Sequence, residues 1–133
     1  MTTINSYSHN VSGEREFGFA QAIKVGKTIY VSGQLSHDEE GNFLHPDDFD
    51  AQLKQVYANF GKVLDHFNVT RNQVVSETQY VVNLHEHGTA MAAANLTYFG
   101  DHRPTSSTVG ADSLFFPGQL IEISFVIDTR LPA

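Results

Sequence analysis

The sequence contains no cysteine, few basic residues and no long apolar run. Without cysteine the chain has no disulfide, no thiolate nucleophile and no cysteine-ligated zinc site, so its stability must come from packing and association. No run approaches the roughly 20 apolar residues that cross a bilayer. Residues 1–13 are polar and lack the apolar core of a signal peptide. We therefore expect a cytoplasmic protein with no membrane partner.

Positive charge is scarce, because eight lysines and arginines stand against 15 aspartates and glutamates, which gives a formal net charge of −7. The basic residues are scattered rather than gathered in a stripe, so we expect no nucleic-acid partner. A chain of 133 residues with 41% hydrophobic content suffices for one domain over residues 1–133. The acidic clusters around Asp38 and Asp48 are interpreted as solvated loops and helix starts rather than cation sites.

Hydrophobic periodicity predicts seven elements. They are strands over residues 19–25 and 28–32 joined by a tight turn, a helix from Asp47 or Asp48 to Asn68, a strand over 74–84, a helix over 85–100, and strands over 106–111 and 120–127. The order β-β-α-β-α-β-β predicts an α+β domain with both helices on one face of a mixed sheet.

The last predicted strand places a carboxylate on the face that the helices leave open. Ile121, Ile123 and Phe125 point one way, whereas Glu122 points the other, because successive strand residues alternate. The second face is too apolar to be left wet, so self-association would cover it. Such a seam is able to tune the proton affinity of Glu122 for general acid or base work. Alternatively, Glu122 only meets an arginine or a backbone amide of a neighbouring subunit.

Other chemistries have little support in the sequence. His85 and His87 are two residues apart at a helix start, so they do not share a face, and no third ligand follows at a metal-binding spacing. The motifs of serine hydrolases, P-loop enzymes and dinucleotide-binding domains are absent. We therefore expect no metal and no cofactor.

Five groups of residues, taken in order, resemble the landmarks of one family. They are Val31-Ser32-Gly33-Gln34, Gln52 with Asn59, Asn95-x-x-Tyr98, Pro104 with Val109, and Pro117-Gly118-Gln119-Leu120-Ile121-Glu122-Ile123. The sequence thus resembles the Rid (reactive intermediate deaminase, YjgF-like) family, also called endoribonuclease L-PSP or translation-inhibitor family. The resemblance implies a chorismate-mutase-like fold, a homotrimer whose sheets meet in a central barrel, and clefts between subunits that bind a small molecule.

The resemblance also implies hydrolysis of reactive enamines and imines, such as 2-aminoacrylate, to a keto acid and ammonia. Glu122 stands where the family has its water-activating, catalytic glutamate. Gly33 corresponds to a backbone position close to the ligand, and Asn95 to the helix position whose amide lies near it. These three residues are therefore expected in the cleft.

Two positions depart from the family pattern. Ser106 replaces the arginine that anchors the substrate carboxylate, and Phe19 replaces a tyrosine whose hydroxyl reaches the cleft. Losing a charge-assisted bidentate anchor removes roughly 1.5 to 3 kcal/mol per hydrogen bond. We therefore expect a member of an arginine-lacking branch, with a hydroxyl-lined pocket of Ser106, Ser107 and Thr108 that binds a neutral or weakly anionic molecule.

These departures leave more than one function open. One hypothesis is an imine or enamine deaminase with altered specificity, and the other is a trimeric small-molecule binding or sensing protein without turnover. Arg15 and Arg103 are candidates to replace the missing guanidinium, although both are interpreted as surface residues. The ribonuclease role of some relatives is disfavoured by the acidic charge balance.

Overall fold

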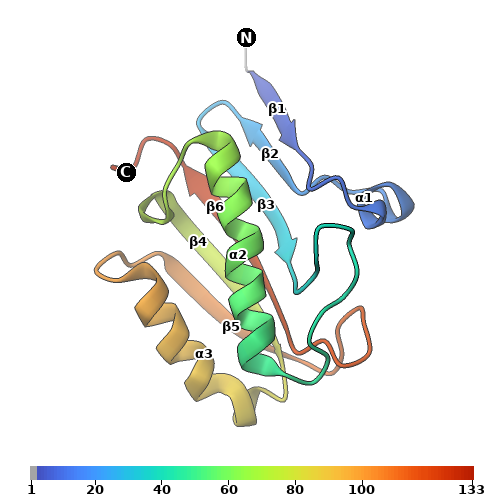
Figure 1. Cartoon of the computed structure of the whole chain (residues 1–133). Coiled ribbons are helices and arrows are strands. Elements are labelled where there is room, and N and C mark those ends of the chain that lie inside the picture. The colour runs from blue at the N-terminus through green and yellow to red at the C-terminus, as the bar shows by residue number, and fades with distance from the viewer. Residues whose placement is uncertain (1–2) are drawn as a thin grey trace.

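The computed structural model of the protein describes residues 3–133 and shows a mixed α+β architecture (Figure 1). In chain order the elements are β1 (Ile4–Tyr7), α1 (Ser12–Phe17), β2 (Ala22–Val25), β3 (Thr28–Gln34), α2 (Phe49–Phe67), a short 3-10 helix (Arg71–Gln73), β4 (Val74–Val82), α3 (Leu84–Phe99), β5 (Thr105–Ala111) and β6 (Ile121–Asp128). The sheet order is β1-β2-β3-β6-β4-β5. Neighbouring strands are antiparallel except β4 and β5, which are parallel. The predicted mixed sheet is confirmed.

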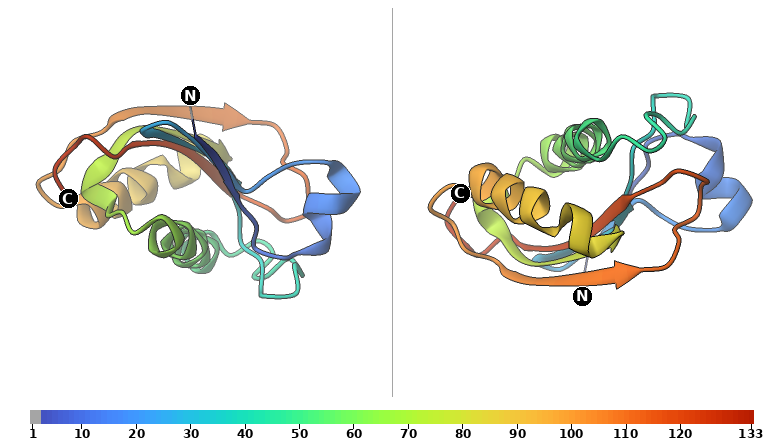
Figure 2. Two further views of the ribbon diagram at one scale, coloured as in Figure 1. Left: turned by 90° about the horizontal axis from the view of Figure 1, so that it is seen from above. Right: turned by 90° about the horizontal axis from the view of Figure 1, so that it is seen from below.

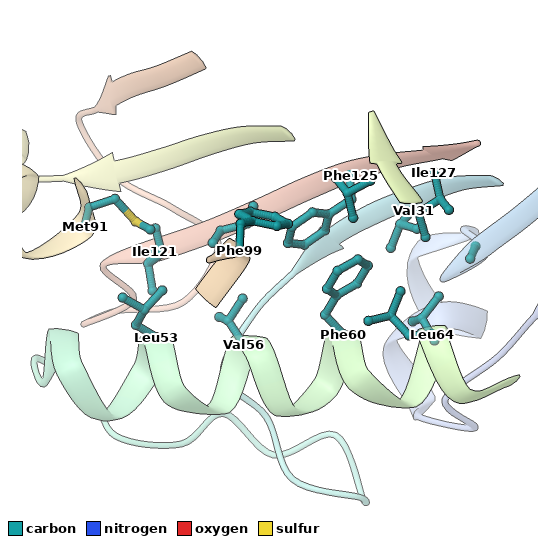
Figure 3. Close-up of a cluster of buried hydrophobic side chains, with 14 of the residues drawn as sticks. Val31, Leu53, Val56, Phe60, Leu64, Met91, Phe99, Ile121, Phe125 and Ile127 are labelled. Atoms are coloured by element: carbon teal, nitrogen blue, oxygen red, sulfur yellow. The ribbon is translucent and has the colours of Figure 1, made fainter. Parts of the chain in front are cut away.

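Helix α2 forms over the predicted residues, because both of its ends are capped. The side chain of Asp48 accepts a hydrogen bond from the backbone N–H of Ala51 at 3.1 Å. Asn68 ends the helix in the left-handed region with φ 54°. The apolar stripe of α2 packs on the sheet, where the ring of Phe60 stacks on that of Phe125 with 3.7 Å between centroids (Figure 3). This contact lies in the centre of the hydrophobic core.

Helices α2 and α3 lie on the same side of the sheet, whereas α1 lies beyond its end (Figure 2). Along β6 the residues that face the helices are almost completely buried, namely Ile121, Ile123, Phe125 and Ile127. No helix of residues 3–133 covers the opposite face (Figure 2). That open face carries exposed apolar side chains, which are Ile4, Ile23, Val25, Tyr30, Tyr80 and Val109.

Near the N-terminus the prediction from sequence was wrong in three respects. Strand β1 and helix α1 were not predicted, and Phe19 follows α1 instead of starting a strand. Strand β1 has only four residues and forms through pairing with β2, as in Ile4 with Val25, which local periodicity does not reveal. Helix α1 has six residues and is followed by Gly18, whose φ of 75° favours glycine. Elsewhere the boundaries shift by at most two residues.

Two further properties concern residues 3–133 as a whole. In this range no helix combines the length and apolarity needed to cross a membrane. The same residues contain no group of three or more histidine, aspartate or glutamate side chains placed to hold a metal ion.

Candidate functional site

The carboxylate of Glu122 lies directly against the backbone of β3. Strand β3 pairs with β6, and the register between them shifts between Val31 and Gln34, so that Gly33 stands in the irregular part. A Cβ atom on Gly33 would lie 2.5 Å from Cδ of Glu122, far inside van der Waals contact. Glycine at residue 33 is therefore what allows the glutamate side chain to lie at this position.

Glu122 and Gly33 line a cavity of about 310 Å³ at the α1 end of the sheet. Most of its wall is apolar and aromatic, formed by Val11, Gly13, Phe17, Phe19, Leu35, Gly41, Phe115 and Phe116. The polar side chains in the wall are Gln21, Ser32, His37 and Glu122. Phe19, which the sequence placed in the ligand cleft, is therefore part of this wall.

Burial raises the pKa of Glu122 above the usual range of a glutamate. Desolvation disfavours the charged carboxylate, and no lysine or arginine of residues 3–133 lines the cavity to compensate. A carboxyl group whose pKa moves toward neutral pH is suited to both donating and accepting a proton. The environment of Glu122 is thus that of a candidate acid–base group.

Gln21 contributes a side-chain amide to the same cavity. A chain of hydrogen-bonding side chains fixes its position. Its Oε1 accepts a hydrogen bond from Nε2 of Gln34 at 2.9 Å. Oε1 of Gln34 in turn accepts from Nε2 of His9 at 2.8 Å, and Nδ1 of His9 lies 2.9 Å from the hydroxyl of Tyr7. With its oxygen engaged, Gln21 presents its amide nitrogen as the group available to a ligand.

Asn95, Ser106 and Thr108 lie in a second cavity of about 360 Å³ between α3 and β5. Gln79 connects two of them, because its Nε2 donates to Oδ1 of Asn95 at 3.1 Å and its Oε1 accepts from Oγ1 of Thr108 at 2.6 Å. No residue of the described chain, 3–133, lines both cavities. A single protomer thus divides the predicted site residues into two separate sets.

Ser107 belongs to neither cavity. It pairs with Thr78 of β4, whereas Ser106 and Thr108 pair with Glu77 and Gln79. Since neighbouring strand residues point to opposite faces, Ser107 lies on the open face of the sheet. The prediction that these three consecutive hydroxyl residues line one pocket was therefore wrong for Ser107. In a strand, the middle side chain points to the opposite face from its two neighbours.

The two arginines proposed as substitutes differ in position. Arg15 is exposed on α1 and does not line the cavity of Glu122. Arg103 lines the second cavity together with Ser106. Its Nη1 donates to the carbonyls of Gly100 and His102. Of these two arginines, Arg103 therefore shares a cavity with Ser106, whereas Arg15 does not.

A second acidic residue, Glu77, is buried beneath Ser106 and Asn95, and sequence reasoning missed it. It is 2% exposed, and burial raises its pKa, an effect that the hydrogen bond from Gln79 opposes. Its Oε1 accepts from Nε2 of Gln79 at 3.0 Å. The alternation of strand residues was the available signal, because it places Glu77 and Gln79 on the face of the buried Val81.

The family described as endoribonuclease L-PSP matches residues 4–128, nearly the whole chain. The chain belongs to this family. A RutC family protein of Pyrococcus abyssi is 32% identical to this L-PSP-family chain over 96 residues, which cover 72% of this chain and 75% of the relative. The 2-iminobutanoate/2-iminopropanoate deaminase of Rattus norvegicus is 30% identical over 108 residues, covering 81% and 77%.

Solved structures agree with the fold of this L-PSP-family protein. A member of the YjgF/YER057c/UK114 family from Mycobacterium tuberculosis has a TM-score of 0.83 at 23% identity, covering 95% of this chain and 99% of that chain. RidA from a Psychrobacter species has a TM-score of 0.75 at 26% identity, covering 83% and 87%. The resemblance to the Rid (YjgF-like) family inferred from sequence is confirmed.

Proposed function

We propose that this Rid-family protein hydrolyses an imine or enamine to a carbonyl compound and ammonia, with Glu122 as the proton-transferring group. The observation that carries the proposal is the placement of Glu122, a half-buried carboxyl of raised pKa that Gly33 admits to a ligand-sized cavity. Relatives named 2-iminobutanoate/2-iminopropanoate deaminase support the reaction class. The arginine-lacking position, Ser106, points to a specificity different from theirs.

The proposed chemistry balances with water as the only co-substrate. Water attacks the imine carbon, a C–O bond forms, and the electrons of the C=N double bond move to nitrogen. Glu122 takes a proton from the water and delivers a proton to the nitrogen. In the resulting carbinolamine the hydroxyl proton is transferred to the nitrogen, the C=O bond forms as the C–N bond breaks, and ammonia and the carbonyl product leave. Gln21 and Ser32 are the cavity groups placed to orient the substrate or the water.

We further propose that the complete site forms between two copies of the chain in a homotrimer. The separation of the Glu122 cavity from the cavity of Asn95, Ser106 and Thr108 supports this, because a single protomer keeps the acid and these three hydrogen-bonding side chains apart. The exposed apolar side chains of the open face, such as Tyr30 at 54% and Val109 at 43% exposure, also favour association. Strand β5 lies at the edge of the sheet, and the unpaired backbone groups of an edge strand are available to another chain.

The alternative is a small-molecule binding or sensing protein that uses the same cleft without turnover. The specific observation in its favour is Ser106, because a hydroxyl does not fix a carboxylate as a guanidinium does. Without that anchor a bound substrate would be held less firmly in one orientation. Catalysis depends on this orientation more than binding does.

The test is a coupled assay in which a pyridoxal-phosphate enzyme generates 2-aminoacrylate or a larger imine, and keto-acid release is followed with and without this protein. Acceleration by the wild type and none by Glu122→Gln would support hydrolysis. No acceleration with any imine by a folded protein would leave the binding function. Light scattering during gel filtration gives the mass of the assembly, and a monomeric mass would contradict the shared cleft.

A further inference from the structure

Four phenylalanines line the Glu122 cavity, and a fifth packs against one of them; together they come from three separate stretches of the chain. Phe17 ends α1, Phe115 and Phe116 belong to the loop before β6, and Phe43 lies in the loop before α2. The rings of Phe17 and Phe115 meet edge-on with 4.8 Å between centroids, and those of Phe115 and Phe116 do so at 4.9 Å. Phe43 stacks on Phe116 at 5.2 Å. With Phe19, which also lines the cavity, these residues form what we call the aromatic rim.

The aromatic rim is exposed to a degree unusual for phenylalanine. Phe17 is 56%, Phe115 64% and Phe19 40% exposed, although large apolar side chains are mostly buried in folded proteins. Three exposed rings at the edge of one cavity form an apolar patch rather than scattered single residues. A partner molecule with apolar surface would remove this patch from water.

The described side chains that line this cavity offer no lysine or arginine to form an ion pair with a small carboxylate ligand. Its lining contains one carboxyl group, Glu122, and no lysine or arginine among residues 3–133. The groups that the described part of one protomer offers a ligand here are therefore apolar side chains and the polar side chains of Gln21, Ser32 and His37, with no lysine or arginine for an ion pair. At about 310 Å³ the cavity also reaches the range of roughly 300–1,000 Å³ that is typical of larger organic ligands. A three-carbon imine would leave much of it empty.

We propose that the aromatic rim makes this site selective for imines whose carbon carries an aromatic or large apolar group. The inference rests on the proposed function, because it names the substrate class of the same site. The rings of Phe17, Phe115 and Phe19 receive the apolar group, and the imine carbon lies toward Glu122. Aromatic contacts then supply the affinity and the orientation that a guanidinium at residue 106 would otherwise supply.

The experiment compares two imines made in place by an L-amino-acid oxidase, one from phenylalanine and one from alanine. Semicarbazide competes for each imine, and the fall in semicarbazone formation measures hydrolysis by the protein. We expect kcat/KM for the phenylalanine-derived imine to exceed that for the alanine-derived imine about tenfold or more. Phe115→Ala is expected to lower the first value about threefold to tenfold and thereby to reduce the preference between the two imines.

Leu114→Ala is the matched control, since Leu114 precedes Phe115 in the same loop but does not line the cavity. We expect it to preserve the preference for the aromatic imine. A second measurement, calorimetric binding of phenylpyruvate against pyruvate, needs no turnover. Both probes carry the same keto-acid group, so their difference in affinity reports only the side chain.

The outcomes separate the two proposals. Tighter binding of phenylpyruvate that Phe115→Ala removes, without any hydrolysis, would support the aromatic rim and contradict the proposed reaction. Equal hydrolysis of both imines, unaffected by Phe115→Ala, would support the reaction and overturn the selectivity. Equal or absent binding of both probes together with no hydrolysis would overturn both.

Discussion

Two carboxyl groups, those of Glu77 and Glu122, lie on opposite faces of one sheet. They differ in whether a ligand can reach them. Glu77 faces the helices and is 2% exposed, and its Oε1 accepts a hydrogen bond from Nε2 of Gln79. Glu122 faces away from them and borders an open cavity. Burial raises the pKa of both groups. A raised pKa alone therefore does not identify a catalytic acid, whereas access to a ligand does.

Replacing the carboxyl group of Glu122 by an amide is expected to have the largest effect on activity. Glu122→Gln keeps the shape of the side chain but abolishes proton transfer, so we expect a loss of hydrolysis of about 100-fold or more. The coupled imine assay measures the loss, and thermal unfolding should stay close to that of the wild type. Unchanged turnover in a folded protein would show that Glu122 does not handle the proton.

The pH dependence of the wild type sharpens the same point. Because burial raises the pKa of Glu122, the limb of kcat/KM that reports its ionisation is expected at higher pH than for an ordinary glutamate. A limb at the pH of a solvated glutamate would contradict the assigned environment.

Gly33→Ala is expected to have the next largest effect, because the new Cβ would meet Cδ of Glu122 at 2.5 Å. The glutamate must move, so we expect activity to fall about tenfold or more. Overpacking should also lower the free energy of unfolding by about 1 to 3 kcal/mol. Denaturant unfolding and the imine assay measure the two effects.

The chain offers a matched control and a rescue for this substitution. A Cβ on Gly61, inside α2, would meet nothing within 4 Å, so Gly61→Ala is expected to stabilise the protein by about 0.5 to 1 kcal/mol. Adding Glu122→Ala to Gly33→Ala removes the clash and should restore stability without activity. Equal stability of both Gly33 variants would mean that the glutamate relaxes freely.

Ser106→Arg is expected to have a smaller effect, a gain of about tenfold in hydrolysis of small, carboxylate-bearing imines. The gain depends on Glu77, which lies beside Ser106 and would attract the new guanidinium. We therefore expect a larger gain when Ser106→Arg is combined with Glu77→Gln. No gain in either variant would show that the cleft differs elsewhere from those of the deaminases.

The sequence predicted the elements with strong periodicity and missed those formed by distant pairing. The stripe of α2 and the alternation of β6 fixed the layers, because each is long and each buries one side. Strand β1 and helix α1 carry no such pattern, although α1 contributes Phe17 to the cavity. The residues of the aromatic rim therefore could not be predicted from local sequence patterns.

For the candidate site, the sequence predicted residues but not how they group. Glu122, Gly33 and Phe19 lie in one cavity, and Asn95, Ser106 and Thr108 in another. Their division depends on which face of the sheet each strand residue occupies and on the packing of α3 over β5. The roles of these residues in binding and catalysis stay predictions.

Glu77→Gln is the smallest expected effect and completes the comparison. Glu77 has a raised pKa in the folded protein, so its folded state binds more protons than the unfolded chain over the interval between the two pKa values. The stability that this group contributes is complete below the unfolded pKa and is lost as the pH rises toward the folded pKa. Glutamine does not ionise, so we expect the variant to match the wild type in acid and to become relatively more stable as the pH rises. Denaturant unfolding at several pH values measures this difference, and parallel curves would contradict it. Because Glu77 lies on the opposite face from Glu122, hydrolysis should stay within about twofold of the wild type.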